Sequence, residues 1–278
     1  MQKVDRLGWA VGLSIKSYGV RIGIRSNDPA GLKKVRKHLP HSWELSSSPF
    51  VERMYSILVG LKSAHANVRR FNLLYGDHIR LARSLDLDQV FETFESDLRL
   101  FVAELARRRV FVHAGVVGWK GKAIVVPGRS FSGKSSLVAE LVRAGATYYS
   151  DEYAVFDSRG RVHPFPKPLE MREAGDVRQS KIAVETLGGR TGTRPLPVGL
   201  VVMTQFREGA QWRPRRLSAG KGVLELLSNT VSARREPEKA LVALQHVVAR
   251  AQIVKSARGE SRDIVQSILN RLEEECSR

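Results

Sequence analysis

Apolar and polar positions alternate near the start of the chain with the period of two that half-buried strands show. Residues 8–26 alternate in this way around Lys16-Ser-Tyr-Gly19 and predict a β-hairpin. Asn27-Asp28-Pro29 then starts a helix that we expect to run to about His38, before Leu39-Pro40 ends it. Further strands are predicted at 52–59, 69–75 and 78–82. Residues 1–85 therefore predict a small N-terminal α+β accessory domain.

From residue 86 the apolar spacing becomes helical. The apolar residues between 86 and 108 recur at intervals of three and four, which predicts one long helix leading into a strand at 110–117. The turn Trp119-Lys-Gly-Lys122 joins that strand to the apolar run 123–126, so the two strands are predicted to form an antiparallel hairpin. We place a domain boundary near residue 86, with a second domain over 86–278.

The rest of the chain alternates strand and helix patterns. A helix at 136–142 stops at Arg143-Ala-Gly145 and is followed by one predicted strand at 146–156. Residues 175–197 are rich in Gly, Arg and Thr and predict either a mobile active-site loop or a disordered segment. The remaining predicted elements are a buried strand at 198–203 and helices at 221–229, 236–249 and 261–275. This pattern is typical of an α/β fold with a mixed sheet.

Composition narrows the class of protein. A chain of 278 residues with 42% apolar residues can build one large or two modest domains. Its single cysteine, Cys276, excludes a disulfide framework and a cysteine-based metal cluster. The N-terminal residues lack the apolar core of a secretion signal, and no stretch approaches the length of a membrane span. We expect a soluble, cytoplasmic protein.

The formal net charge of +18 predicts attraction to anions, whether nucleotide, nucleic acid, acidic protein or anionic lipid. The basic residues come as scattered pairs and triplets, and most are not interleaved with the aromatic residues on which single-stranded nucleic acids stack. This arrangement disfavours nucleic acid as the main partner without excluding it. Self-association is left open.

The strongest motif follows the strand at 123–126. Gly128-Arg129-Ser130-Phe131-Ser132-Gly133-Lys134-Ser135 fits the phosphate-loop pattern G-x-x-x-x-G-K-[ST], and a helix opens at Ser136. The glycines let backbone N–H groups point at phosphate oxygens, and the helix N-terminus adds positive potential. Lys134 is predicted to reach the terminal phosphates and Ser135 to hold Mg²⁺. Residues 128–136 are thus predicted to bind a nucleotide, and the alternative is an ordinary Gly/Ser turn.

Asp151 and Glu152 are the first candidates for acidic chemistry beside this loop. They lie on the strand that follows the phosphate-loop helix, and phosphoryl transfer requires Mg²⁺ ligands and a group that orients the attacking oxygen. The strand at 198–206 offers no acid until Glu208. Because successive strand residues point to opposite faces, we expect only one of the two acids to face a metal. The alternative is a pair of solvated acids on an edge strand.

Taken in order, His113-Ala-Gly115, the phosphate-loop pattern, Ser150-Asp-Glu152 and Leu169-Glu-Met-Arg172 resemble the catalytic domain of the HPr kinase/phosphorylase family, over about residues 110–206. The resemblance implies a P-loop kinase core whose fold is like that of phosphoenolpyruvate carboxykinases. It also implies roles for individual residues. Lys134 would contact the terminal phosphates of ATP, and Mg²⁺ would be surrounded by Ser135, Asp151 and Glu170. Asp151 would act as the acid/base or as a metal-linked carboxylate. Glu152 would face the acceptor, and His113 would lie near the transferred phosphoryl group.

Departures from the family pattern bear on the substrate. Glu152 stands where the family usually has Asp, and Glu173 follows Arg172 where the family has Gly. The arginine-containing loop that bifunctional members use for phosphorolysis has no clear counterpart, which argues against HPr itself as the acceptor. His113 alone would also fit a core histidine, and Glu170 a solvated strand residue. Candidates for an anion clamp, each also compatible with a solvated face, are Arg190, Arg194, Arg213, Arg215 and Arg216.

The sequence therefore predicts an ATP-dependent kinase that transfers the γ-phosphoryl group to a hydroxyl, expected to be that of serine, either free, in a peptide or in a protein. A second hypothesis is a nucleotide-binding regulatory or nucleic-acid-associated protein that uses the same loop without kinase activity. A third is a carboxykinase-like enzyme, for which the required metal-binding Lys/His set is not found in the sequence. ATP, GTP and pyrophosphate are not distinguished.

Overall fold

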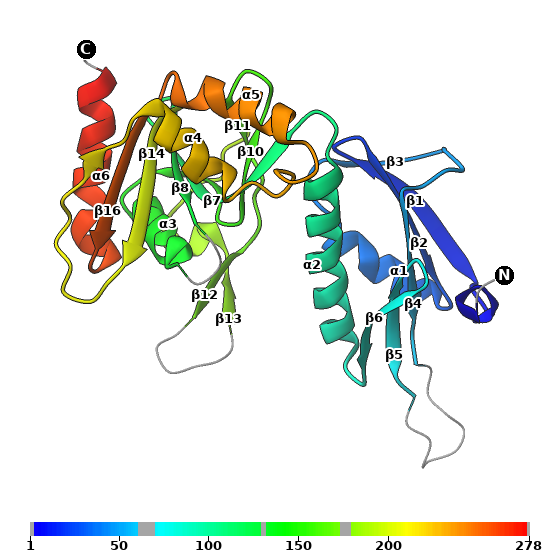
Figure 1. The fold of residues 1–278 in the computed structure, drawn as a ribbon. Coiled ribbons are helices and arrows are strands. Elements are labelled where there is room, and N and C mark those ends of the chain that lie inside the picture. The colour runs from blue at the N-terminus through cyan, green and yellow to red at the C-terminus, as the bar shows by residue number, and fades with distance from the viewer. Residues whose placement is uncertain (1–2, 61–69, 129–131, 173–178, 277–278) are drawn as a thin grey trace. The chain divides into compact units, whose positions relative to one another are not determined.

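The computed structural model describes residues 3–60, 70–128, 132–172 and 179–276 (Figure 1). The chain is a mixed α/β protein that forms two compact units, Met1–Arg108 and Arg109–Arg278. Each unit is described by itself below.

The first unit is built on a sheet with strand order β3-β1-β2-β4-β5-β6. Its strands are β1 (Val11–Ser17), β2 (Val20–Ser26), β3 (Trp43–Leu45), β4 (Arg53–Leu58), β5 (Asn72–Gly76) and β6 (Ile79–Ser84). Its helices are α1 (Pro29–Val35), α2 (Leu87–Leu105) and the short 3₁₀ helices Lys3–Arg6 and Arg36–His38. The predicted hairpin is confirmed, because β1 and β2 pair antiparallel from Val11–Ser26 to Ser17–Val20. The start of α1 is also confirmed, since the Asp28 carboxylate accepts from the amides of Ala30 and Gly31.

Helix α2 belongs to this first unit, whereas the sequence placed the boundary before it, near residue 86. Phe91, Phe94 and Leu98 of α2 are fully buried and pack with Ile22 and Tyr55 of the sheet in one hydrophobic core. The end of the helix is tied to the same unit, because the Arg107 amide donates to the Tyr18 carbonyl oxygen at 3.0 Å. Periodicity identified the helix but could not show which sheet its apolar face covers.

The second unit contains a larger sheet with strand order β11-β10-β7-β8-β14-β16-β15, in which β9 also pairs with β7 and β11 also pairs with β14. The strands are β7 (Val110–Trp119), β8 (Lys122–Pro127), β9 (Thr147–Ser150), β10 (Tyr153–Phe156), β11 (Arg161–His163), β14 (Leu196–Phe206), β15 (Arg215–Arg216) and β16 (Gln252–Arg258). A separate antiparallel hairpin comprises β12 (Leu169–Arg172) and β13 (Gln179–Ile182). The helices are α3 (Lys134–Arg143), the 3₁₀ helix Val184–Leu187, α4 (Ala219–Leu227), α5 (Pro237–Val248) and α6 (Ser261–Cys276).

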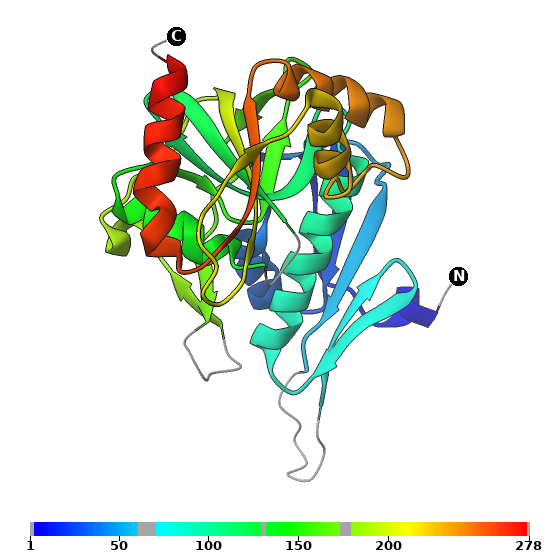
Figure 2. The ribbon, with the colours of Figure 1, turned by 60° about the vertical axis from the view of Figure 1, so that its left-hand side comes forward.

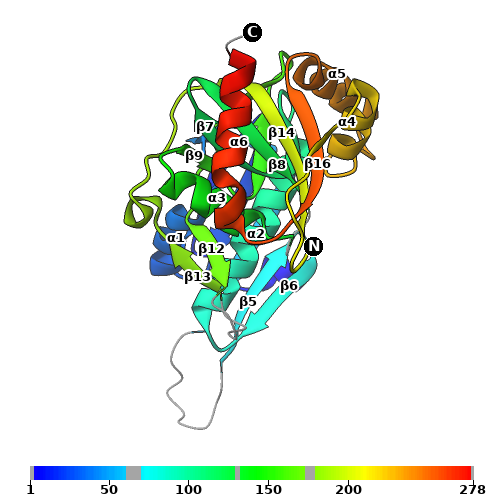
Figure 3. The same cartoon turned by 90° about the vertical axis from the view of Figure 1, so that its left-hand side faces the viewer.

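Helices cover both faces of this sheet. Helices α3 and α6 share one core cluster with strand residues such as Leu200, while α4 and α5 share another with residues such as Val201 (Figures 2 and 3). The predicted β7–β8 hairpin is confirmed as antiparallel. In contrast, β8, β14 and β16 run parallel to one another. Their carboxyl ends therefore meet at the sheet edge from which the Gly128–Ser135 segment leaves.

Three sequence expectations are corrected in this unit. The single strand predicted at 146–156 is two strands, β9 and β10, separated by a bend at Asp151 and Glu152, and both strands pair antiparallel with β7. Strand β16 was not predicted. Residues 179–197 of the Gly/Arg/Thr-rich segment contain β13, a 3₁₀ helix and the start of β14, so this part is not a structureless loop, while residues 175–178 lie outside the described residues.

No helix in the described ranges is long and apolar enough to cross a membrane.

Asp157, in the turn between β10 and β11, should make the free energy of unfolding depend on pH in the acidic range. Burial raises its pKa, but hydrogen bonds from His163, from the Arg161 and Arg159 amides and from the Arg161 guanidinium outweigh burial and lower the pKa to about 2. Because the pKa is lower in the folded state, the stabilisation is complete above about pH 4 and is lost as pH falls toward about 2.

We expect Asp157→Asn to lower the free energy of unfolding by about 2 kcal/mol at neutral pH, with the difference from wild type shrinking between about pH 4 and pH 2. Urea denaturation at a series of pH values measures this. Asp263→Asn, at an exposed position of α6, controls for the loss of one negative charge. A difference that stays constant over the acidic range would contradict the prediction.

Candidate functional site

The Gly128–Ser135 segment connects β8 to α3, as the motif requires. Gly133 is the N-cap of α3 and has φ +81°, a left-handed conformation that suits glycine. A side chain at Gly128 would collide with Ser132, because a Cβ there would lie 2.8 Å from the Ser132 Oγ. Of the residues predicted to bind nucleotide, the described ones are Gly128, Ser132, Gly133, Lys134, Ser135 and Ser136, whereas Arg129, Ser130 and Phe131 lie outside the described residues.

Strand β7 fixes where this segment begins. The Gly128 amide donates to the His113 carbonyl oxygen at 3.0 Å, and the His113 amide donates to the Asn229 carbonyl oxygen at 2.8 Å. Gly115 lets α3 approach the strand, since a Cβ at Gly115 would lie 2.4 Å from Val138 Cγ2. The His113-Ala-Gly115 motif thus has a packing role in addition to any role of the imidazole.

Asp151 contacts Ser135, sixteen residues earlier in the chain. The Ser135 hydroxyl donates to Asp151 Oδ2 at 3.2 Å, and the Glu170 amide donates to the same oxygen at 3.4 Å. The Tyr148 hydroxyl lies 3.3 Å from Asp151 Oδ1. Asp151 is only 5% exposed, and burial raises the pKa of its carboxyl group, an effect that the positive charge of Lys167 opposes. The first acid of the Ser-Asp-Glu motif is therefore buried at the start of α3, beside the motif serine.

Lys167 links the other two predicted acids and was missed by sequence reasoning. Its ammonium Nζ lies 3.3 Å from Glu152 Oε2 and 3.2 Å from Glu170 Oε1, and its side chain is 12% exposed. Glu152 and Asp151 thus diverge, with Glu152 facing Lys167 and Asp151 facing Ser135. The only signal in the sequence was that Lys167 lies three residues before Glu170. Its position between two prolines is typical of a turn and does not indicate a functional residue.

Lys134 and His113 complete the cluster. Burial lowers the pKa of Lys134, the charges of Asp151 and Glu152 oppose this, and the charge of Lys167 adds to it. Burial also lowers the pKa of His113, the Lys134 charge adds to this and the Glu152 charge opposes it. The His113 ring packs against Tyr153, with ring centroids 4.9 Å apart. At neutral pH His113 is therefore a neutral imidazole within the electrostatic reach of Lys134.

The residues present fit a Mg²⁺ ion in part. Among the described residues, no group of three or more His, Cys, Asp or Glu side chains is arranged to hold a metal ion. Ser135 and Asp151 nevertheless offer a hydroxyl and a carboxylate in contact with each other, and Mg²⁺ is commonly held by one or two such oxygens while keeping several waters. Glu170, the third predicted ligand, approaches Asp151 through its backbone amide, and its carboxylate pairs with Lys167.

The contacts of the five arginines proposed for an anion clamp do not bring their side chains together in the described part of the chain. Arg190 and Arg194 contribute backbone carbonyls, which accept from the Tyr148 amide and the Tyr149 hydroxyl, each at 2.8 Å. Arg213, Arg215 and Arg216 are exposed, the last two in β15 at the end of the sheet order. These observations favour solvated faces for all of them.

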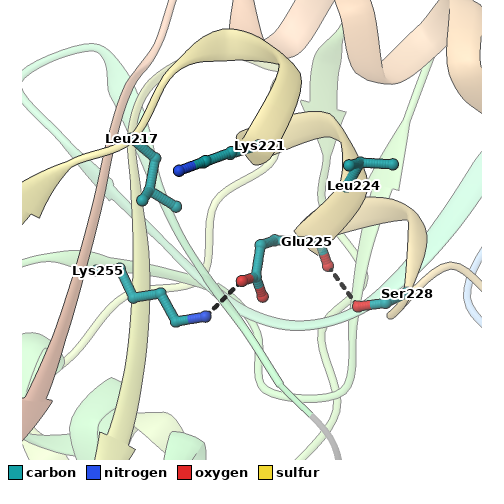
Figure 4. Close-up of a pocket in the computed structure, with 6 residues that line it drawn as sticks. All are labelled: Leu217, Lys221, Leu224, Glu225, Ser228 and Lys255. Atoms are coloured by element: carbon teal, nitrogen blue, oxygen red, sulfur yellow. Dashed lines mark hydrogen bonds and ion pairs between the residues drawn. The ribbon is translucent and has the colours of Figure 1, made fainter.

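A surface pocket of about 530 Å³ lies beside α4 and shares no residue with this cluster (Figure 4). Lys255 forms an ion pair with Glu225 across it, and the Ser228 hydroxyl donates to the Glu225 carbonyl oxygen at 2.8 Å. The pocket is lined by Leu217, Lys221, Leu224, Glu225, Ser228 and Lys255. None of these residues was predicted to be functional.

Comparison with known proteins adds no identification, because no family model and no curated protein matches the chain. The case for a function therefore depends on the residues and their geometry.

Proposed function

We propose that the second unit is an ATP-dependent kinase with a core of the HPr kinase/phosphoenolpyruvate carboxykinase type, which transfers the γ-phosphoryl group to a hydroxyl acceptor. One observation carries the proposal. The phosphate-loop serine, Ser135, and the first acid of the Ser-Asp-Glu motif, Asp151, contact each other at 3.2 Å at the start of α3. The two motifs were identified independently in the sequence, and their contact is what a shared Mg²⁺·ATP site requires.

In this proposal the Gly128–Ser136 residues bind the phosphates of ATP. Amides at the start of α3 and the positive end of the helix attract the phosphate oxygens. The Lys134 ammonium neutralises charge on the terminal phosphates, and its partial burial strengthens that interaction because the local dielectric is low. Ser135 and Asp151 would hold Mg²⁺, which would supply positive charge beside the phosphates.

The acids and His113 then act on the acceptor side. Asp151 acts either as the base that accepts the proton of the attacking hydroxyl or as a carboxylate linked to Mg²⁺. Glu152 faces the acceptor, and Lys167 holds both Glu152 and Glu170 in place. His113, being neutral, can donate or accept a hydrogen bond beside the transferred group.

The acceptor is proposed to be a serine hydroxyl, free, in a peptide or in a protein. The test incubates the protein with γ-labelled ATP and Mg²⁺ against free serine, serine-ending peptides and a cell lysate. We expect label to appear in at least one acceptor in the presence of wild type and not of Asp151→Asn. ATP turnover with no labelled acceptor in any arm, or equal labelling by the variant, would contradict the proposal.

The net charge of +18, with exposed arginines at β15, permits a second candidate, a nucleotide-gated nucleic-acid binder without kinase activity. We expect instead that nucleic acid binds weakly and without sequence preference, because the basic residues are dispersed. Fluorescence anisotropy with duplex DNA, single-stranded DNA and RNA across a salt series measures this, with and without ATP·Mg²⁺. For duplex DNA, each neutralised phosphate contributes about −0.9 to the slope of log affinity against log salt. Submicromolar binding at physiological salt that changes with nucleotide would favour the second candidate.

A further inference from the structure

The pocket beside α4 combines cationic and apolar side chains in one hollow. Lys221 and Leu224 come from α4, Leu217 from the segment between β15 and α4, and Lys255 from β16. Figure 4 shows the Lys221 side chain reaching from the helix toward Leu217. Single exposed leucines are common on protein surfaces, but Leu224, which is 65% exposed, lines a hollow of about 530 Å³, within the size range of ligand sites. The pocket therefore offers a ligand both an apolar contact and positive charge.

Positive charge is in excess around this pocket. Glu225 is the one carboxylate among its described lining residues, and it forms an ion pair with Lys255. Lys221 forms no ion pair with a residue in the described ranges. Arg215 is the cross-strand partner of Lys255, so its exposed side chain lies on the same face of the sheet as Lys255. Because Glu225 balances Lys255, the charges of Lys221 and Arg215 remain, and they favour an anionic ligand.

An acidic peptide segment fits these features better than a nucleic acid does. The described lining contains no aromatic ring on which a base could stack, and the Glu225 carboxylate would repel a chain of phosphates. A peptide can instead pair a carboxylate with Lys221 and place an apolar side chain against Leu217 and Leu224. Its backbone amides can donate to Glu225 or to the Ser228 hydroxyl oxygen, which keeps a lone pair while its own proton is donated to the Glu225 carbonyl oxygen. A peptide thus matches each kind of group in the lining.

We propose that this pocket is a docking site for an acidic segment of a protein partner, in which one apolar side chain is flanked by carboxylates. The apolar side chain packs against Leu224, and the carboxylates pair with Lys221 and Arg215. Because ion pairs at an exposed site stay hydrated, such a segment binds with a Kd of about ten to several hundred micromolar. This inference goes beyond the proposed function, since the pocket shares no residue with the cluster around Asp151 and docking requires no nucleotide.

The test measures the fluorescence anisotropy of a labelled peptide with one leucine between two pairs of glutamates. We expect saturable binding to the wild-type chain that weakens as the salt concentration rises. One comparison peptide has serine in place of the leucine, and another has glutamines in place of the glutamates. Each should bind about tenfold more weakly, because each loses one of the two kinds of contact.

Two exposed residues of the pocket provide the test on the side of the protein. Lys221→Glu reverses the charge that pairs with the peptide, and Leu224→Ser removes the apolar contact, so each should weaken binding by about tenfold. The matched controls are Lys33→Glu and Leu100→Ser, at exposed positions of α1 and α2. They make the same changes of charge and of apolar surface outside the pocket, and we expect them to bind the peptide as wild type does. All four positions are exposed, so each variant should fold.

Three results would overturn this inference. One is the absence of saturable binding of the acidic leucine peptide to wild-type protein at millimolar concentration. Another is an equal loss of affinity in Lys33→Glu and Lys221→Glu, which would show attraction to the net charge of the chain. The third is displacement of the labelled peptide by a single-stranded RNA oligonucleotide at a lower concentration than by unlabelled peptide, which would assign the surface to nucleic acid. The proposed function is tested separately, because Lys134→Ala, which should lose phosphoryl transfer, should bind the peptide as wild type does.

Discussion

Replacing Lys134 with Ala is expected to abolish phosphoryl transfer while leaving the protein folded. In the proposed function the ammonium group provides the positive charge beside the terminal phosphates, and removing such a charge-assisted contact in a partly buried site should lower kcat/KM by about a thousandfold. Burial lowers the pKa of Lys134, which means that the charged form is disfavoured in the folded protein. Its removal should therefore cost little stability. Steady-state turnover and the thermal midpoint, measured on the same preparation, test both parts.

Lys120→Ala provides the control for this substitution. Lys120 lies in the turn between β7 and β8, its side chain is 58% exposed, and its ion pair with Glu273 is of a kind that contributes little to stability. We expect it to behave as wild type in turnover. A folded Lys134→Ala protein with turnover close to that of Lys120→Ala would contradict the phosphate-loop interpretation.

Asp151→Asn should reduce turnover by orders of magnitude, largely keep nucleotide binding and raise the thermal midpoint. Because burial raises the pKa of Asp151 in the folded state, ionisation of this group opposes folding as pH rises above its ordinary value. Removing the charge should thus stabilise the protein at neutral pH. The gain over wild type should grow as pH rises from the ordinary carboxyl pKa to the raised pKa of the folded state, and stay constant above it. Activity assays and thermal melts across a pH series measure the two effects.

An asparagine side chain at position 151 can form the hydrogen bonds that the Asp151 carboxylate forms. Its oxygen can replace Oδ2 and accept from Ser135 and from the Glu170 amide, while its NH₂ group can donate to the Tyr148 oxygen. The Tyr148 hydroxyl keeps its own acceptor, the Lys167 carbonyl oxygen at 2.8 Å. A lower thermal midpoint for Asp151→Asn at neutral pH would show that the ionised carboxylate is well compensated in the fold.

Glu152→Gln is the comparison variant for the Asp151 result. Glu152 pairs with Lys167 rather than with Ser135. We therefore expect the Glu152→Gln substitution mainly to raise the KM for the acceptor. If Glu152→Gln is inactive and Asp151→Asn is nearly wild type, the two roles must be exchanged. If both variants are active, the reaction takes place elsewhere.

The parts of the fold set by local sequence were predictable. The hairpin around Tyr18-Gly19, the β7–β8 hairpin and the strand and helix on either side of the Gly128–Ser135 segment all follow from apolar spacing and turn residues. The divergence of Asp151 and Glu152 was also expected, although for a different reason. A regular strand was assumed, whereas the two residues form the bend between β9 and β10.

What sequence reasoning missed depends on contacts between distant segments. Strand β16 has only two adjacent large apolar residues, Ile253 and Val254, and nothing local shows that it pairs with β14 or that Arg258 reaches Gly133. Lys167 likewise has no motif, since its importance comes from bringing Glu152 and Glu170 together. The predicted boundary near residue 86 lies before α2, whereas the packed core shows that α2 covers the N-terminal sheet.

Equilibrium binding of ATP by calorimetry, with and without Mg²⁺, measures whether the Gly128–Ser135 segment binds a nucleotide. We expect saturable binding of one nucleotide per chain with a Kd between about a micromolar and a millimolar, tighter with Mg²⁺ than without, and lost in Lys134→Ala but kept in Lys120→Ala. Absence of binding by wild-type protein at millimolar ATP·Mg²⁺, or equal binding by wild type and Lys134→Ala, would contradict this expectation.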